Sequence, residues 1–470
     1  MDDRLRQLDL VGLRRSYATK ELSPTEYVRA TLDAVAAIDP GLGAFLTVDA
    51  EGALDRARTA ERTLRTEGGA AFRSRPLLGV PVSVKDLTPT RGLRTTRGAV
   101  ALRDWVPDED APAVARLRRA GAVLIGKTNT SEGGWSAATR NLLAPPTANP
   151  WNVARSAGGS SGGAAAAVAA GLGVAATGTD GAGSIRIPAS FCGVVGFKPT
   201  FGRIPYAPVS PERLSHLGPI TRSVADAGIL LDVLAGPDPA DPYSLDLPGE
   251  PHGSTPDVLR IGWIARPGQL TPQPDVLDRC GRAVATLAAL GHVVEAIDAP
   301  FDDPYPTLVT VLAAAEAAGQ PAQRDPLADP DRLAVVAHGR RLTAADLMRA
   351  EAERAALRQR LHACMSRYDL LVMPTVPVEP FDRAAIRPDH GADGSPLDWL
   401  AWAPACHPFN LTGQPAVSIP VGFGATGLPV GLQLVGAWHR DSVVLRAAHD
   451  LEAALPATGV PPRPESQDLR

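Results

Sequence analysis

The chain has 470 residues, of which 44% are hydrophobic and 21% charged, and its formal net charge at pH 7 is −4. This is the composition of an ordinary globular protein, and the length allows a large core. The weakly acidic balance, without any Lys/Arg block, gives no electrostatic reason to expect nucleic acid or an anionic membrane surface as a partner. We therefore expect a small-molecule partner, no nucleic acid and no membrane.

The N-terminus and the cysteines predict a cytoplasmic protein. The first residues, MDDRLRQLDL, are charged and lack the apolar core of a signal peptide, and no run of about 18 apolar residues is present that could span a bilayer. The four cysteines show no CxxC spacing, which fits reduced thiols better than disulfides or a zinc site. They are Cys192, Cys280, Cys364 and Cys406. We expect neither a metal nor a cofactor.

Two helices are predicted near the start of the chain. Ser23 is a candidate N-cap, Pro24 occupies the first helical position and Glu26 lies three residues after the cap, which predicts a helix over 22–39. A second, more polar helical stretch covers roughly 50–68.

From residue 77 to 240, short apolar runs alternate with helical patterns. The strand candidates lie at 77–87, 122–126 and 174–180, and the helix candidates at 111–121, 161–172 and 223–236, the last capped by Ser223. This alternation predicts helices layered on a β-sheet, the α/β class.

The pattern continues after a break in the second half of the chain. Residues 236–258 are rich in Pro, Asp and Gly and are typical of a long surface connection, whereas 320–345 shows little apolar periodicity. Predicted strands lie at 259–264, 293–297, 369–378, 416–423 and 429–436, and predicted helices at roughly 274–290, 307–319 and 343–366. We expect one large α/β domain with a more variable central insertion.

The glycine-rich stretch around Ser160 allows two interpretations that its surroundings argue against. Gly158 to Gly162 matches the G-x-S-x-G elbow that carries the nucleophile of α/β-hydrolases, but the preceding ANPWNVARSA lacks the buried strand that an elbow needs. Gly158 to Gly163 has the spacing of a phosphate loop, but two alanines follow where Lys-Ser/Thr is required. A serine esterase that uses Ser160 with an acidic residue and a histidine stays an alternative.

Ser184 lies in a setting better suited to a nucleophile. The segment GTDGAGSIR follows an apolar run, and its small residues allow backbone N–H groups to crowd beside the Ser184 hydroxyl, as in an oxyanion hole. Lysine occurs only four times, at Lys20, Lys85, Lys127 and Lys198, so 43 of the 47 basic residues are arginine. An amine retained in the apolar VPVSVKDL can lose its proton, which an arginine cannot.

These segments together resemble the amidase signature family. The resemblance is carried by GVPVSVKD, GKTNTSE, GGSSGGAAAAVAAG and GTDGAGSIRIPASFCGVVGFKPTFGRIP, and it extends through LGPITRSVADAGILLDVLAG to FNLTGQPAVSIPVGF and GLPVGLQLVG. It implies a single domain over 1–470 with a mixed, twisted sheet covered by helices on both faces. The signature core would span about 77–235 and 369–450, with a variable insertion at about 240–365.

The resemblance also implies a Ser–cisSer–Lys triad. Ser184 would be the nucleophile, Ser160 the serine after a cis peptide bond and Lys85 the base, which leaves Ser161 a structural role. A neutral Lys85, its pKa lowered by burial, would accept the proton of Ser184 through Ser160. The oxyanion would be held by the backbone N–H groups of Gly181, Ala182, Gly183 and Ser184.

The implied reaction is hydrolysis of a small-molecule carboxylic amide through a seryl acyl-enzyme, which releases a carboxylic acid and ammonia or an amine. One departure from the family pattern is Ala182 in Asp180-Gly181-Ala182-Gly183-Ser184, where D-T-G-G-S is common, so the oxyanion hole is expected to be slightly reshaped. The amide-transferring subunit of a tRNA-dependent amidotransferase shares the signature and is a further alternative. The substrate is left open, and a homodimer is compatible with the sequence.

Several other polar residues have two interpretations each. Asp180 either hydrogen-bonds the glycine turn or is a solvated or capping carboxylate, and Arg186 either orients a carboxylate or supports that turn. Lys127 and Lys198 are expected to lie along strands with their ammonium groups in solvent. His216 and His407 are expected to be structural, because the lysine mechanism needs no histidine. Cys192 is expected to be a packed thiol.

Overall fold

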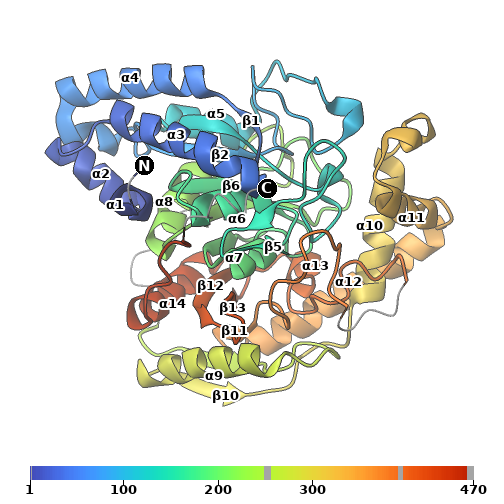
Figure 1. Ribbon diagram of the computed structural model, residues 1–470. Helices are drawn as coiled ribbons and strands as arrows, with labels where there is room; N and C mark the ends of the chain where they lie inside the picture. Colours follow the sequence, from blue (N-terminus) through green and yellow to red (C-terminus); the bar gives the residue numbers. More distant parts are fainter. Residues whose placement is uncertain (2, 248–255, 390–394, 463–470) are drawn as a thin grey trace.

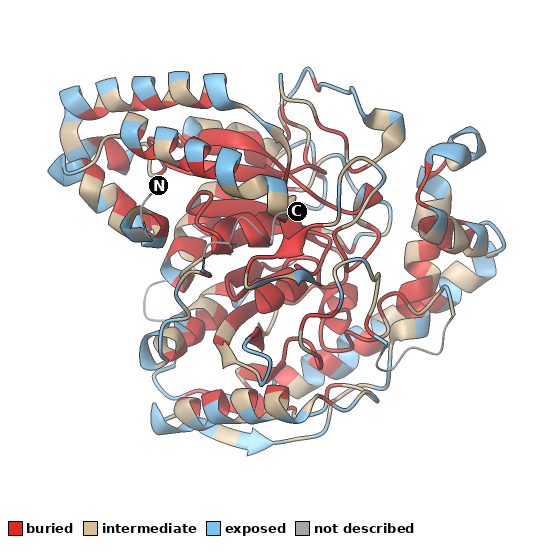
Figure 2. Cartoon of the chain, in the orientation of Figure 1, coloured by how far each residue is buried: buried red, intermediate tan, exposed pale blue. Residues whose placement is uncertain are grey.

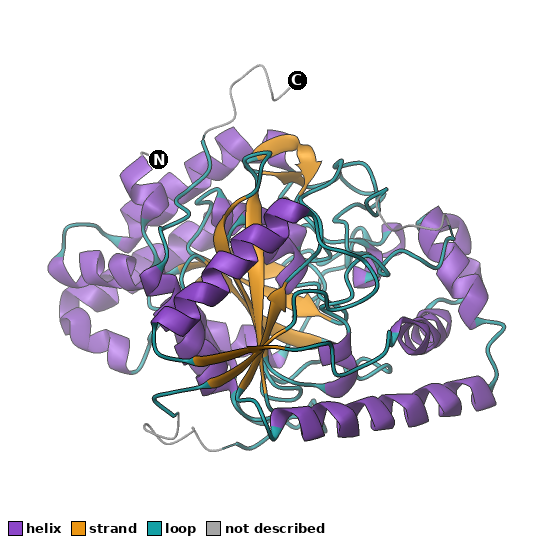
Figure 3. Ribbon diagram, turned by 90° about the horizontal axis from the view of Figure 1, so that it is seen from below, coloured by secondary structure: helices purple, strands orange, loops and turns teal. Residues whose placement is uncertain are grey.

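The protein is described by a computed structural model that covers residues 1, 3–247, 256–389 and 395–462. A large sheet runs through the centre of the molecule with helices on both sides (Figure 1), and the view along it shows the strands fanned into a twist (Figure 3). The α/β class, the single large domain and the mixed sheet predicted from the sequence are confirmed.

Eleven strands form this sheet within the described part of the chain. In spatial order they are β1 (Phe45–Val48), β3 (Val123–Thr128), β2 (Pro81–Lys85), β6 (Ala175–Asp180), β8 (His216–Thr221), β7 (Val195–Lys198), β12 (Ala416–Phe423), β13 (Pro429–Gly436), β11 (Leu370–Pro374), β9 (Arg260–Trp263) and β10 (Val293–Ala296). A separate two-stranded sheet joins β4 (Ala148–Asn149) and β5 (Asn152–Ser156). Strand β2 pairs in parallel with both β3 and β6, whereas β6 pairs antiparallel with β8.

Helices pack on both faces of the sheet. One face carries α3 (Pro24–Leu42), α4 (Ala50–Glu67), α6 (Gly162–Ala169) and α7 (Arg186–Cys192), and the other carries α2 (Leu10–Thr19), α5 (Pro112–Arg119), α8 (Val224–Leu234), α9 (Pro274–Ala289) and α14 (Asp441–Ala454). The remaining helices are α1 (Asp3–Gln7), α10 (Tyr305–Gly319), α11 (Pro330–Gly339), α12 (Ala344–Met365), α13 (Pro408–Thr412) and the 3₁₀ turns η1 (Gly68–Arg73), η2 (Val100–Leu102), η3 (Glu132–Gly134) and η4 (Ala322–Leu327).

The alternation of side chains along a strand decides which face each residue serves. On β2, Val82 and Val84 join the core beneath α5 and α8. Because successive side chains point to opposite faces, Lys85 points to the other side, where α6 begins. Figure 2 shows most strands of the central sheet and α6 buried, β10 exposed at the border of the sheet, and the outer helices banded, with only their inner stripes buried.

Local signals in the sequence account for several helix boundaries. Ser23 accepts a hydrogen bond from the Glu26 N–H, and the Glu26 carboxylate accepts one from the Ser23 N–H, which completes the predicted capping box of α3. The segment 320–345, for which no helix was predicted, contains η4 and α11. The predicted surface connection at 236–258 lies partly outside the described residues. Among those described, no helix has the length and apolar character needed to cross a membrane.

Candidate active site

Three segments meet at the edge of the sheet where β2 and β6 end. These two strands are parallel neighbours, so their carboxyl ends lie side by side, which is where open α/β sheets place their sites. Lys85 ends β2, the glycine-rich stretch with Ser160 and Ser161 leads into α6, and the turn that follows β6 carries Ser184. The Ser161 N–H donates to the Ser184 carbonyl oxygen at 3.1 Å, which ties the last two segments together.

Lys85 is fully buried and its amine is surrounded by oxygen atoms. Its Nζ lies 2.7 Å from Ser160 Oγ, 2.8 Å from Ser161 Oγ and 2.9 Å from Thr179 Oγ1, with the Thr179 carbonyl oxygen at 3.3 Å. Burial holds the pKa of Lys85 well below its ordinary value, and the negative charge of Asp180 opposes this only in part. The surroundings therefore favour a neutral amine.

The hydrogen bonds of Ser161 determine how a neutral amine is oriented. Ser161 Oγ donates its one proton to the Thr179 carbonyl oxygen at 3.1 Å, so towards Lys85 it can only accept. The Thr179 carbonyl oxygen also only accepts. Together with the Thr179 hydroxyl at 2.9 Å, these acceptors compete for the two N–H bonds of the amine, and an orientation that gives both bonds to them leaves the lone pair facing the Ser160 hydroxyl.

Close packing explains the glycines around Ser160. A Cβ on Gly159 would lie 2.6 Å from the Ala138 carbonyl carbon, and one on Gly163 would lie 2.4 Å from the Asn129 nitrogen. Such approaches exclude any side chain at both positions. The peptide bond between Gly159 and Ser160 is cis.

The turn that carries Ser184 is built around a buried ion pair. The Asp180 carboxylate accepts from the N–H groups of Gly183 and Ile185 at 2.7 and 3.2 Å, and from Arg186 Nε at 2.9 Å. Burial alone would raise the pKa of Asp180, but the guanidinium of Arg186 holds it below its ordinary value. The structure therefore supports one of the two interpretations of each residue. Asp180 hydrogen-bonds the turn, and Arg186 supports it.

The predicted oxyanion hole needs one correction. The Gly183 N–H already donates to the Asp180 carboxylate, so it is not available to an oxyanion. Of the four backbone donors predicted, this leaves Gly181, Ala182 and Ser184. The Gly183 N–H is occupied because Asp180 precedes the turn, and its carboxylate closes the turn by accepting a hydrogen bond from the N–H three residues later.

Ser160 and Ser184 both line one cavity, whose volume is about 350 Å³. Gly181 and Ala182 lie in its wall, and Ser184 is 9% exposed. The aromatic part of the lining comes from Trp135, Tyr206 and Trp399, and the charged part from Arg97, Glu132, Glu212, Glu316, Arg324 and Arg332. No histidine occurs among the described residues that line this cavity.

Outside this cluster, two of the expectations about lysines were wrong. Lys127 and Lys198 are fully buried, and neither ammonium group reaches solvent. Lys127 Nζ contacts Thr88 O, Thr90 Oγ1 and Thr95 Oγ1, whereas Lys198 Nζ contacts the carbonyl oxygens of Gln414 and Pro199. Both ammonium groups donate to buried oxygens, so a strand composition that fits a snorkelling lysine also fits a buried one.

Two contacts of the Lys85 amine were not predicted from the sequence. Thr179 is a direct partner of Lys85, and Ser161, expected to be merely structural, touches the amine as closely as Ser160 does. His216 and His407 are buried away from the cavity. His216 Nδ1 lies 2.6 Å from the Leu214 carbonyl oxygen, and burial lowers its pKa. The missed contacts depend on how the Ser160–Ser161 turn is rotated, which the sequence does not record.

A large mixed α/β sheet with a buried lysine among serines at the wall of a cavity defines an amidohydrolase that acts on C–N amide bonds. Comparison with known proteins agrees. The Amidase family matches residues 26–445, and the chain belongs to that family. An acylamidase from Rhodococcus erythropolis is 38% identical to it over 97% of either chain.

Two further similarities bear on the activity. A glutamyl-tRNA(Gln) amidotransferase subunit from Moorella thermoacetica is 37% identical over 92% of this chain and 93% of its own. The structure of 6-aminohexanoate cyclic dimer hydrolase superposes with a TM-score of 0.88 at 32% identity, covering 97% of this chain and 99% of that one. Similar proteins thus include hydrolases as well as a component of an amidotransferase.

Proposed function

We propose that this amidase hydrolyses small, neutral carboxylic amides through an acyl-enzyme on Ser184, with Ser160 as relay and Lys85 as base. The observation that carries the proposal is the 2.7 Å approach of Lys85 Nζ to Ser160 Oγ inside a buried cluster, with Ser160 and Ser184 lining one cavity. A buried neutral amine is a competent general base, and no histidine of the described lining is at hand to replace it.

The chemistry follows from these positions. The Ser184 hydroxyl attacks the amide carbonyl carbon while its proton passes to Ser160, whose own proton passes to the lone pair of Lys85. The oxyanion is held by the N–H groups of Gly181, Ala182 and Ser184. The relay then returns the proton to the departing nitrogen, the C–N bond breaks, and an ester on Ser184 remains. Water activated by the same relay cleaves this ester and releases the carboxylic acid.

The lining of the cavity supports a neutral substrate. Its three arginines and three glutamates balance in charge. The guanidinium of Arg332 donates to Glu132 and Glu316, at 2.9 and 2.7 Å, and is therefore not available to a ligand. Trp135 and Trp399, with ring centroids 6.2 Å apart, offer an apolar surface. We therefore propose amides whose acyl or amine part is apolar or aromatic, consistent with the similarity to an acylamidase.

Amide transfer within a larger complex is the second candidate function, favoured by the similarity to a glutamyl-tRNA(Gln) amidotransferase subunit. The two functions differ in what the isolated chain can do. A hydrolase turns over a simple anilide alone, whereas a transfer subunit depends on glutamine and partner subunits. A cytoplasmic location, a homodimeric state, independence from nucleic acid and the division into a signature core and a central insertion stay predictions from the sequence.

The test combines turnover with labelling. The purified chain is expected to release 4-nitroaniline from 4-nitroacetanilide, and a fluorophosphonate is expected to label the peptide that contains Ser184. Ser184→Ala should lose both signals. A label on Ser160 would favour the esterase elbow instead, and a chain inert towards anilides but active on glutamine with partner subunits would favour amide transfer.

A further inference from the structure

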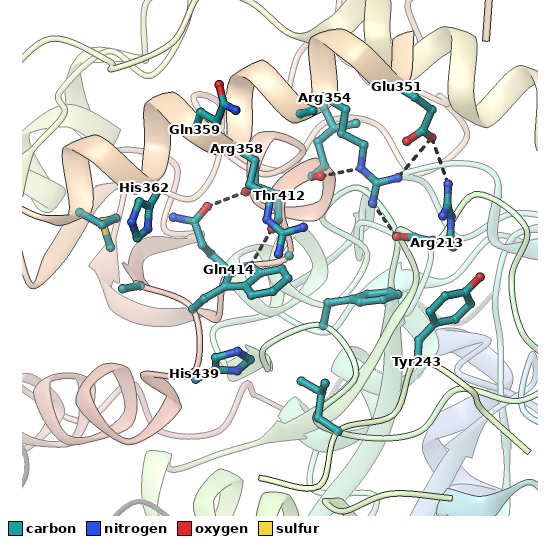
Figure 4. A pocket seen from close by; sticks show the side chains of 18 of the residues that line it. Arg213, Tyr243, Glu351, Arg354, Arg358, Gln359, His362, Thr412, Gln414 and His439 are labelled. Atoms are coloured by element: carbon teal, nitrogen blue, oxygen red, sulfur yellow. Dashed lines mark hydrogen bonds and ion pairs between the residues drawn. The ribbon is translucent and has the colours of Figure 1, made fainter. Parts of the chain in front are cut away.

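A second cavity, of about 1100 Å³, lies beside α12 and is separate from the cavity of Ser160 and Ser184. We call it the Arg358–Trp438 groove. Helix α12 supplies one wall with Glu351, Arg354, Arg358 and His362, and Tyr243 and His439 face that wall from the opposite side (Figure 4). No described residue lines both cavities, so the groove is not an extension of the active site.

Arg358 presents a guanidinium with unused donors to this groove. Its guanidinium carbon lies 3.5 Å from the centroid of the Trp438 ring. No described residue accepts a hydrogen bond from it, whereas Arg354, one helical turn earlier, is bonded to the carbonyl oxygens of Leu411 and Arg213 at 2.7 and 2.8 Å. Arg354 therefore serves the fold, and Arg358 keeps its N–H groups for a ligand.

The Trp438 ring is fixed before any ligand arrives. Its Nε1–H donates to the Thr412 carbonyl oxygen at 2.7 Å. Gly413, with φ of 82°, lies so close to the ring that a Cβ there would be 3.0 Å from Trp438 Cζ2. The ring is thus fixed by Thr412 and Gly413, and Arg358 stacks on it. An arginine stacked on an immobile ring loses little freedom when it binds an anion.

Positively charged side chains outnumber negatively charged ones around the groove. Three arginines and one carboxylate line it, and that carboxylate, on Glu351, lies 3.6 Å from the guanidinium of Arg213. The other titratable residues of the described lining are His362, His439 and Tyr243. Arg358 is an exposed residue, and partial burial of its guanidinium lowers its pKa.

We propose that the Arg358–Trp438 groove is a second ligand site, which binds a small organic carboxylate with an aromatic or apolar body. The carboxylate accepts two hydrogen bonds from the fork of Arg358, and the body lies on Phe201, Leu411 and Met365. One unpaired guanidinium matches one carboxylate, and Phe201, Leu411 and Met365 offer apolar contacts that a bare inorganic anion cannot use. The site does not depend on the proposed roles of Ser184, Ser160 and Lys85.

Photolabelling tests the proposal on the full chain. The probe is 4-benzoylbenzoate, whose benzophenone inserts into nearby C–H bonds on irradiation, and labelled peptides are identified by mass spectrometry. We expect label on the peptides of α12 that contain Arg358 or Met365, or on the one that contains Trp438. The neutral analogue 4-(hydroxymethyl)benzophenone should label these peptides at least tenfold less, because it cannot pair with the guanidinium.

Matched variants test whether labelling of the groove depends on Arg358. Arg358→Gln should reduce groove labelling roughly tenfold, whereas Arg360→Gln, an exposed arginine on the same helix that does not line the groove, should leave it unchanged. Both variants should keep the wild-type rate on an anilide. Trp438→Leu provides a second variant that removes the ring but not the charge. Equal labelling by the neutral analogue, equal labelling in Arg358→Gln, or label confined to peptides of the Ser184 cavity would each overturn the proposal.

Discussion

Replacing Lys85 by methionine is the most direct perturbation of the proposed relay. Methionine keeps the length and the apolar stem of the side chain but has no atom that can accept the Ser160 proton. Because burial lowers the pKa of Lys85, the native amine is favoured as neutral, and its replacement breaks no ion pair. The hydrogen bond from Ser161 Oγ to the Thr179 carbonyl oxygen, 3.1 Å long in the native protein, does not involve Lys85. The variant should therefore fold.

The expected loss of activity follows from the contacts of Ser160. Lys85 is the one described side chain that is hydrogen-bonded to Ser160 Oγ, so no neighbour can take over its role. A positioned general base contributes roughly 10²- to 10⁴-fold, and the lack of a substitute places Lys85 near the upper end of that range. We expect kcat/KM to fall by about 10³- to 10⁴-fold, which corresponds to about 4–5.5 kcal/mol of transition-state stabilisation.

The pH profile distinguishes loss of a base from loss of structure. Acylation needs the unprotonated amine, so the wild-type rate should fall as the pH drops through the pKa of Lys85 and level off above it. Since burial lowers that pKa, the plateau should begin below the ordinary lysine value of about 10.4. The residual activity of Lys85→Met should lack this limb. Lys85→Arg should be as inactive as Lys85→Met, because a guanidinium stays protonated.

Lys127→Met is the matched control, since Lys127 is another fully buried lysine, on the adjacent strand β3, and touches no serine of the site. It should retain kcat/KM within about tenfold, whereas the loss of its buried hydrogen bonds to Thr88, Thr90 and Thr95 should cost about 1–3 kcal/mol of stability. Rates of 4-nitroacetanilide hydrolysis and thermal unfolding curves measure the two effects. A folded Lys85→Met enzyme with more than a tenth of the wild-type kcat/KM would refute the relay.

Two further predictions concern residues near the site. His216→Asn should keep the acylation rate within about tenfold in single-turnover assays, because its imidazole faces the Leu214 carbonyl oxygen and not the cavity; a loss of several orders of magnitude in folded protein would point to histidine catalysis. Arg332→Met should lower the free energy of unfolding by about 3–5 kcal/mol in denaturant titrations, because it leaves the carboxylates of Glu132 and Glu316 without their buried partner; unchanged stability would show that they take up protons without cost.

The sequence predicts those parts of the site whose chemistry depends on which residue types follow one another along the chain. Ser184 follows a glycine turn after a strand, and Lys85 ends another strand, so the order of residues, together with the family resemblance, marks both as candidates before their spatial relation is known. The parallel pairing of β2 and β6 then brings them to one edge of the sheet. The capping box of α3 was predictable for the same reason, because all of its atoms belong to four consecutive residues.

What the sequence could not predict depends on contacts between distant segments. Strand β8 contains Gly218 and Pro219, which are poor strand formers, and it exists because it pairs with both β6 and β7. Helix α11 is held by Arg332, whose partners Glu132 and Glu316 are 200 and 16 residues away in the chain. The occupation of the Gly183 N–H by Asp180 likewise depends on the shape of a turn and not on which residues compose it.

Ser161 offers a last test, because the geometry gives it a different role from that of Ser160. By accepting an N–H of Lys85 it turns the amine lone pair towards Ser160, so it is a positioning residue and not a member of the relay. Ser161→Ala should lower the plateau of kcat/KM by roughly tenfold, whereas Ser160→Ala, which interrupts proton transfer, should lower it by about 10³-fold or more.

The sign of the pH effect separates positioning from mere structural support. Ser161 Oγ stabilises the ammonium form of Lys85 more than the amine, because a charged donor makes the stronger hydrogen bond. Its removal therefore lowers the pKa of Lys85, and the ascending limb of the Ser161→Ala profile should move to lower pH even as the plateau falls. A structural defect would lower the plateau and leave the limb in place. A limb that moves to higher pH would mean that Ser161 donates to the amine, and the assignment of the lone pair to Ser160 would be wrong.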